Sequence, residues 1–113
     1  MLKYRSKDMS SVEIPDDMYS MTLIDCVGPI ESLKNIKKLY LESVDLEELL
    51  IPSDHLELIS LNPFCTYNNY FDFTIFPNLK ELYLNYLGIE IFDWKMVPPS
   101  LRVLCLNDNP LSV

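Results

Sequence analysis

The chain has 113 residues, of which 49% are apolar and 23% charged, and its formal net charge is -8. This balance is typical of a soluble globular protein, and the length suffices for one hydrophobic core but not for a catalytic module beside it. The negative charge argues against nucleic acid or an anionic membrane as the main partner, because both are bound through Lys and Arg; it favours a neutral or basic protein surface.

The first 17 residues carry scattered apolar side chains ahead of Pro15, namely Leu2, Tyr4, Met9, Val12 and Ile14. They predict a strand or a hairpin that covers the N-terminal end of the core. No stretch here is apolar enough for a signal peptide, and no later run approaches the ~20 residues of a membrane-spanning helix. The three cysteines are odd in number and far apart, and no glycosylation acceptor occurs, so we expect a reducing, cytoplasmic setting.

From residue 18 onward one apolar pattern recurs five times, with the spelling L-x-x-L-x-L-x-x-N/C. Its marked positions hold Met18, Met21, Leu23, Cys26; Ile36, Leu39, Leu41, Val44; Leu56, Ile59, Leu61, Phe64; Leu79, Leu82, Leu84, Leu87; and Leu101, Leu104, Leu106, Asn109. The starts lie 18, 20, 23 and 22 residues apart. This pattern resembles the leucine-rich-repeat superfamily, whose shortest repeats have this period.

The resemblance implies an α/β-type repeat solenoid over residues 1–113, with an N-terminal cap at 1–17 and about five repeats over 18–111. It implies a leucine-rich-repeat arc with a short parallel β-sheet on the concave face and a convex side of irregular, 3-10 or short helical segments. Asn or Cys normally fills the ninth position, which here reads Cys26, Val44, Phe64, Leu87, Asn109. We therefore expect a largely missing asparagine ladder and irregular loops. The last repeat, residues 97–111, also resembles repeats of bacterial effector proteins that begin with P-x-x-L-x-x-L.

The alternation inside each repeat predicts a short strand whose fourth and sixth positions face the core and whose third, fifth and seventh positions stay open. Stacking the repeats then gives three open columns: Ser20, Lys38, Leu58, Glu81, Val103; Thr22, Tyr40, Ser60, Tyr83, Cys105; and Ile24, Glu42, Asn62, Asn85, Asn107. Tyr40, Leu58 and Tyr83 form a predicted apolar cluster. With its polar rim of Lys38, Glu42, Ser60, Asn62, Glu81 and Asn85 it is our predicted partner-binding site. The alternative is that tyrosine is simply favoured in strands.

The segments between the strands differ in length. Gly28-Pro29 predicts a turn, and Leu46, Leu49 and Leu50 predict one helical turn before Pro52. The longest segment, 65–78, is either an exposed aromatic patch or part of the core. Because the leucine ladder alone does not offset the entropy of folding, we predict core positions for its apolar residues, with one or two of them left at the surface. These residues are Tyr67, Tyr70, Phe71, Phe73, Ile75 and Phe76. The same prediction covers residues 88–100, with Ile89, Ile91, Phe92, Trp94 and Met96.

Only two residues follow Pro110-Leu111, which leaves no room for a C-terminal cap. Either the natural chain continues, or the edge around Val103, Cys105 and Leu106 is covered by a partner or a second copy. If a second copy covers this edge, we expect a homodimer.

Catalytic chemistry is not expected, because the chain has one histidine, His55, and no identifiable residue to orient it. A pair of His55 with Cys65 remains open geometrically. Cys26, Cys65 and Cys105 lack the clustering of zinc sites, and two glycines sixty residues apart cannot form a phosphate loop. We expect no metal and no cofactor.

Two hypotheses of function follow. The first is an interaction module that binds one protein partner on the concave sheet; its sharper form is a viral or pathogen factor that modulates host signalling in the host cytoplasm. The second is a self-associating structural protein that pairs through its C-terminal edge. An enzyme is the third class, which activity lost on His55→Ala would reveal.

Overall fold

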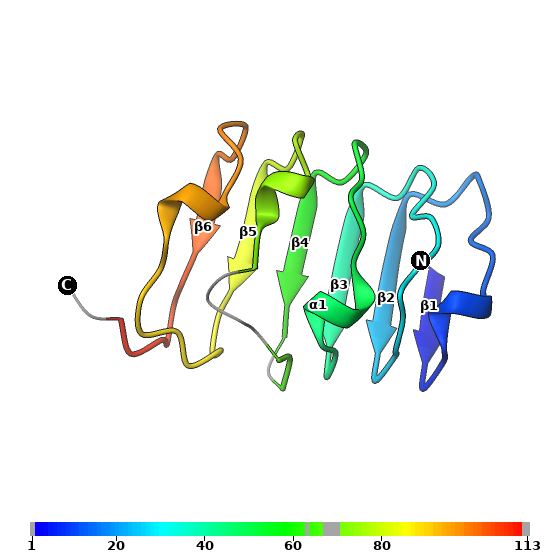
Figure 1. The fold of residues 1–113 in the computed structure, drawn as a ribbon, viewed down its shortest axis with the longest axis horizontal. Coiled ribbons are helices and arrows are strands. Elements are labelled where there is room, and N and C mark those ends of the chain that lie inside the picture. The colour runs from blue at the N-terminus through cyan, green and yellow to red at the C-terminus, as the bar shows by residue number, and fades with distance from the viewer. Residues whose placement is uncertain (1, 63, 67–70, 112–113) are drawn as a thin grey trace.

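The computed structural model describes residues 2–62, 64–66 and 71–111, and its main feature is a six-stranded parallel sheet (Figure 1). The strands lie side by side in chain order: β1 (Leu2–Arg5), β2 (Ser20–Ile24), β3 (Lys38–Glu42), β4 (Leu58–Leu61), β5 (Glu81–Leu84) and β6 (Val103–Cys105). Every neighbouring pair is parallel. The short parallel strands predicted from the alternation are therefore confirmed.

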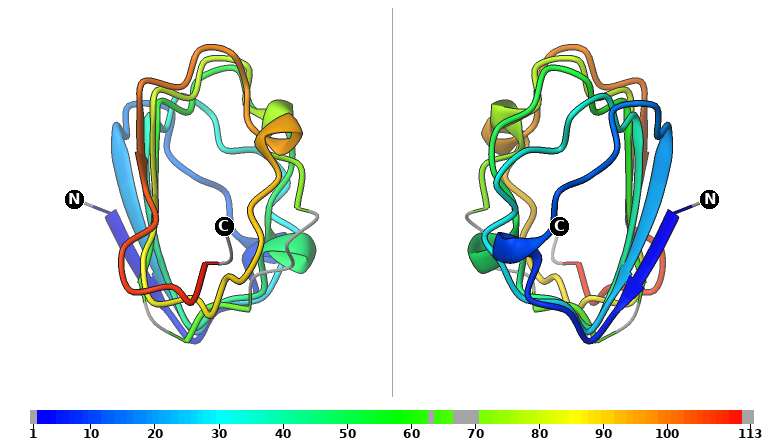
Figure 2. Two further views of the ribbon diagram at one scale, coloured as in Figure 1. Left: turned by 90° about the vertical axis from the view of Figure 1, so that its left-hand side faces the viewer. Right: turned by 90° about the vertical axis from the view of Figure 1, so that its right-hand side faces the viewer.

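Where the structure describes them, the segments that connect the strands return on one side of the sheet and leave its other face open (Figure 2). Parallel neighbours require such a crossover, because the chain must travel back to the starting edge of the sheet. The returns contain short helical turns: η1 (Met9–Ser11), α1 (Leu46–Leu49), η2 (Phe73–Ile75) and η3 (Trp94–Met96). The helical turn predicted ahead of Pro52 is α1. We call each strand with its following return a unit.

Each of these four helical turns begins after an aspartate. The carboxylates of Asp8, Asp45, Asp72 and Asp93 accept hydrogen bonds from the backbone N–H two residues further on, at 3.0, 3.1, 2.9 and 2.9 Å. Aspartate is favoured at this position because its side chain satisfies a donor that the first helical turn leaves free. The same local chemistry therefore starts returns of different length.

The N-terminal segment forms a strand and not a hairpin. β1 pairs with β2 in the register of the other strands, with Leu2 opposite Met21 and Tyr4 opposite Leu23. Met9 and Ile14 behind it are buried. The sheet thus has one strand more than the five occurrences of the sequence pattern.

The core lies between the sheet and the returns. Its ladder consists of the inward residues of β2 to β5, each at most 2% exposed: Met21, Leu23, Leu39, Leu41, Ile59, Leu61, Leu82 and Leu84. The third return adds Phe71, Phe73 and Phe76, which are 7%, 0% and 0% exposed, so the predicted core role of these aromatics is confirmed. Tyr67 and Tyr70 lie outside the described residues.

Residues 88–100 supply core in part, with two side chains at the surface, as many as the prediction allowed. Ile89 is buried, but Ile91 and Trp94 are 67% and 68% exposed. The β6 unit next to them is itself only half-buried at Leu101, Leu104 and Leu106. Among the described residues only 106–111 follow β6, so the return at 88–100 has a neighbouring return of comparable length on one side only.

Every strand is followed by a residue with left-handed backbone. These residues are Ser6, Asp25, Ser43, Phe64, Tyr86 and Asp108, with φ of 54°, 52°, 53°, 75°, 59° and 60°. In five units this residue comes four positions after the first inward residue of the strand, but in the β4 unit it comes five positions after Ile59. The β4 unit therefore carries one additional residue at its turn.

That additional residue corrects the prediction for the ninth position, where Cys65 replaces Phe64. The Cys65 thiol donates to the carbonyl of Leu41 at 3.6 Å, as the Cys26 thiol donates to that of Tyr4 at 3.6 Å. The Asn109 amide donates to the equivalent carbonyl of Leu84 at 2.8 Å. Three units therefore keep the Asn or Cys bridge, and Phe64 is instead 84% exposed.

Candidate functional site

The strand register aligns the predicted columns on the face of the sheet that the returns leave uncovered, which we call the open face. One column runs from Ser20 through Lys38, Leu58 and Glu81 to Val103, and the next from Thr22 through Tyr40, Ser60 and Tyr83 to Cys105. The third pairs Ile24 with Glu42. β1 extends the columns with Lys3 and Arg5, which the sequence pattern missed because β1 lacks the full spelling.

Leu58 is not the exposed anchor that the sequence pattern predicted. Its side chain belongs to the open face by register, yet the residue is only 8% exposed. Lys38 and Glu81 lie beside it on the two flanking strands, and long charged side chains cover apolar neighbours with their stems. Leu58 therefore supports the open face and adds little free apolar area.

The two tyrosines remain half-exposed and share one column, with Ser60 between them. The Tyr83 hydroxyl donates to the Glu81 carboxylate at 2.7 Å. This hydrogen bond raises the pKa of Tyr83, since the neutral phenol is the donor to an anion. The Tyr83 ring is thus held by a polar contact at its tip.

The predicted rim residues Asn62 and Asn85 lie just beyond the ends of β4 and β5. Asn85 accepts a hydrogen bond from the backbone N–H of Asn107 at 2.9 Å. The backbone N–H of Asn62 donates to the carbonyl of Leu41 at 2.8 Å. These two positions therefore join neighbouring turns as well as bordering the open face.

Cations gather at the amino ends of the strands. Lys37 and Lys38 place their Nζ atoms 5.8 and 5.7 Å from the centroid of the Tyr19 ring, within range of a cation–π interaction. Glu57 pairs with Lys80 at 3.3 Å and with Lys37 at 3.6 Å. The hydrogen bond from Lys80 is the main cause of the lowered pKa of Glu57.

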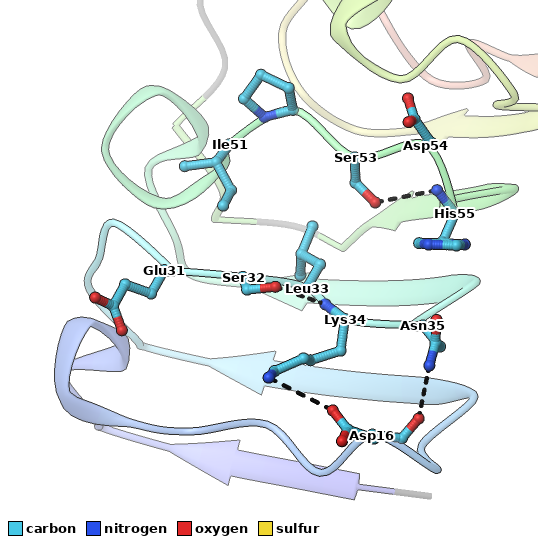
Figure 3. Close-up of a pocket in the computed structure, with 11 residues that line it drawn as sticks. Asp16, Glu31, Ser32, Leu33, Lys34, Asn35, Ile51, Ser53, Asp54 and His55 are labelled. Atoms are coloured by element: carbon cyan, nitrogen blue, oxygen red, sulfur yellow. Dashed lines mark hydrogen bonds and ion pairs between the residues drawn. The ribbon is translucent and has the colours of Figure 1, made fainter.

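A polar hollow of about 490 Å³ lies at this same edge, between the turns that precede β3 and β4 (Figure 3). Asp16 contacts the turn before β3 at two points. The Lys34 ammonium lies 3.5 Å from the Asp16 carboxylate, and the Asn35 amide donates to the Asp16 carbonyl at 2.9 Å. The backbone N–H of His55 donates to the Ser53 hydroxyl at 3.2 Å. Because these groups already partner one another across the turns, the hollow is a weaker candidate than the open face.

The structure does not bring His55 and Cys65 together. His55 precedes β4 and Cys65 follows it, so the two residues lie at opposite ends of that strand. Burial raises the pKa of the Cys65 thiol, which also donates to a carbonyl and is therefore no activated nucleophile. Cys26, Cys65 and Cys105 are all free thiols. Within residues 2–62, 64–66 and 71–111 no His, Cys, Asp or Glu side chains gather in a group that could hold a metal ion.

The C-terminal edge is apolar. Val103 is 40% exposed, while Cys105 and Leu106 are half-buried. Beside them lies a hollow of about 570 Å³ lined by Trp94, Val97, Pro98, Pro99, Leu101, Arg102 and Leu104. The predicted edge residues and the exposed Trp94 therefore share one end of the molecule.

Two exposed aromatics at the carboxyl ends of the strands escaped the sequence interpretation. Phe64 and Tyr86, at the turns after β4 and β5, are 84% and 62% exposed. The pattern assigned Phe64 to the ninth position and gave no role to Tyr86. The 23-residue spacing between the third and fourth starts was the only signal of the additional residue, and it does not say where that residue lies.

None of the helices in the described part of the chain combines the length and the apolar character needed to cross a membrane. Comparison with protein-family models, with curated proteins and with solved structures finds no significant match.

Proposed function

We propose that this chain is a small leucine-rich-repeat solenoid without enzymatic activity that binds a protein partner on the open face of its sheet. The repeat assignment is supported by three features that recur with the sequence pattern. These are the parallel strands in chain order, the left-handed residue after each strand, and the Asn or Cys bridges of Cys26, Cys65 and Asn109. Proteins of this architecture present an extended sheet to their partners.

The observation that carries the binding proposal is the column with Tyr40 and Tyr83. Both rings are half-exposed, on β3 and β5, with Ser60 of β4 between them, and the tip of Tyr83 is fixed by Glu81. Fixed aromatic side chains bind with little loss of side-chain entropy, and the polar residues Lys38 and Glu42 lie beside them. The separation of His55 from Cys65 supports a binding role over catalysis.

The test replaces Tyr40 and Tyr83 together by alanine and asks whether partner binding is lost. Quantitative affinity capture compares the unaltered chain, the double variant and an Ile91→Ala control, whose site is exposed on the return side. The captured protein is then purified and titrated by calorimetry. We expect the double variant to weaken its dissociation constant by about 10- to 100-fold, as truncation of aromatic hot spots does, and the control to match the unaltered chain.

Circular dichroism and thermal unfolding must show that the double variant is folded. Equal affinity of the folded double variant and the unaltered chain would place the partner elsewhere and contradict the proposal.

Self-association through the β6 edge is the second candidate, favoured by the exposed Val103 and by the hollow beside the exposed Trp94. Light scattering over a concentration series would compare the unaltered chain with Leu106→Lys and with Val103→Lys, the latter at an exposed position that tolerates a charge. A concentration-dependent dimer that both variants abolish would support this candidate. A monomeric mass throughout the series would eliminate it.

A further inference from the structure

The turns after β4 and β5 place large aromatic side chains on a strained backbone. Phe64 has φ of 75° and Tyr86 has φ of 59°, a region that only Gly, Asn and Asp enter readily. The four other turns use Ser6, Asp25, Ser43 and Asp108 at the equivalent residue. Small polar residues are therefore sufficient at this turn position, and the fold does not require an aromatic ring there.

The two rings also expose apolar area without packing in the core, since Phe64 is 84% and Tyr86 is 62% exposed. β4 and β5 are hydrogen-bonded neighbours, so their turns are adjacent at the carboxyl edge of the sheet. Tyr86 directly follows Asn85, a residue that borders the open face. Strain and exposure at adjacent turns are typical of a binding feature.

Tyr86 is held in place by the next turn. The neighbouring Asp108 carboxylate raises the pKa of Tyr86, and the backbone N–H of Tyr86 donates to the carbonyl of Asn107 at 3.2 Å. The edge therefore presents an exposed ring beside a carboxylate. The two carboxylate oxygens can accept hydrogen bonds from a guanidinium group.

Charge around the pair has one sign. No Lys or Arg occurs between Lys38 and Lys80, or between Lys80 and Lys95. The turns at the carboxyl ends of β2, β3 and β6 instead carry Asp25, Glu42, Asp45 and Asp108. The cations of β3, β5 and β6 lie at the opposite ends of these strands, at Lys38, Lys80 and Arg102. β1 differs, since its carboxyl end carries Arg5 and Lys7. From β2 to β6 the carboxyl edge is thus complementary to a basic partner.

We propose that Phe64, Tyr86 and Asp108 form a docking site for an arginine-bearing segment of a protein partner. The guanidinium stacks on the aromatic faces and pairs with the Asp108 carboxylate, the combination of contacts that distinguishes arginine from lysine. This proposal rests on the proposed function, because it requires a protein partner. It adds that the partner presents an arginine to the carboxyl edge of the sheet.

The test uses three nine-residue peptides of alternating glycine and arginine, lysine or glutamine, titrated against the unaltered chain by fluorescence anisotropy at about 150 mM salt. The variant Phe64→Asn with Tyr86→Asn keeps the net charge, and asparagine suits the left-handed backbone. We expect this variant to bind the arginine peptide at least about tenfold more weakly, and Ile91→Asn to bind it unchanged. The lysine peptide should bind the unaltered chain more weakly than the arginine peptide.

Equal binding by the Asn double variant and the unaltered chain would reduce the interaction to attraction by net charge and overturn the site. Failure of the unaltered chain to bind the arginine peptide up to about 1 mM would overturn it as well. The melting temperature of the Asn double variant should stay level or rise, because strain is relieved; a clear fall would make the two rings structural and overturn the site. The proposed function fails separately, if Tyr40→Ala with Tyr83→Ala leaves the affinity for the protein partner unchanged.

Discussion

Replacing Phe73 by alanine is expected to lower the free energy of unfolding by about 3–5 kcal/mol, the cost of a large cavity in a packed core. Phe73 is fully buried, and its ring meets that of Phe71 edge to face at a centroid distance of 4.8 Å. Natural domains are stable by only ~5–15 kcal/mol, so this single change should remove a large share of the total. Urea unfolding followed by circular dichroism measures it.

Trp94→Ala is the matched control, since it removes an even larger ring from an equivalent short helical turn. Trp94 is 68% exposed and contacts Phe92 at a centroid distance of 5.3 Å. We expect a loss of about 1 kcal/mol, the value of an aromatic pair. Similar losses for both variants would mean that the third return is not packed as the structure has it.

The strands and the open columns were predictable because two independent constraints act on the same residues. A strand alternates its side chains with period two, and a half-buried strand must place apolar residues on one face. At β2 to β5 both constraints select the same inward residues, such as Leu39 and Leu41. The position of Tyr40 and Tyr83 in one column followed directly.

The additional residue of the β4 unit could not be predicted, since Phe64 and Cys65 are both apolar and either fits the ninth position of the pattern. The choice depends on which of them reaches the carbonyl of Leu41, and this is a property of the folded turn. The sequence could not decide between a strand and a hairpin at the N-terminus, for a related reason. Leu2 and Tyr4 match only part of the repeated pattern, so the pairing of β1 with β2 is visible only in three dimensions.

Burial at single positions was the other limit. The sequence pattern predicts an exposed side chain at Leu58 and a core position at Trp94. The structure shows the reverse, with Leu58 buried and Trp94 exposed. Exposure depends on the side chains of neighbouring units: Lys38 and Glu81 flank Leu58, whereas Trp94 lies beside the half-buried β6 unit. The spacing of residues in one unit does not contain this information.

A small set of local contacts makes units of unequal length compatible with one register. The aspartate caps start the helical turns, the left-handed residues end the strands, and the Asn or Cys bridges tie three of the turns to the previous unit. The return length can then vary, because none of these contacts depends on it. This explains how a spacing that varies from 18 to 23 residues supports a continuous sheet.

Asn109 makes the densest of these bridges, and Asn109→Ala should therefore cost about 2–4 kcal/mol, well above a typical surface substitution. Its amide nitrogen donates to the carbonyls of Leu84 and Leu106 at 2.8 and 2.9 Å. Its amide oxygen accepts from the backbone N–H groups of Leu87 and Ile89 at 2.9 and 3.1 Å. Alanine leaves all four part-buried groups without this partner, and urea unfolding measures the loss.

Two further variants at this position separate the donor from the acceptor. Asn109→Cys keeps a thiol donor for the Leu84 carbonyl, as Cys26 does for Tyr4, but offers only a weak acceptor to Leu87 and Ile89. Asn109→Asp keeps the acceptor and loses the donor. If the bridge acts through both halves, each variant should be more stable than Asn109→Ala and less stable than the unaltered chain. An alanine variant as stable as the unaltered chain would show that water replaces the bridge and that the β6 unit is held by its leucines alone.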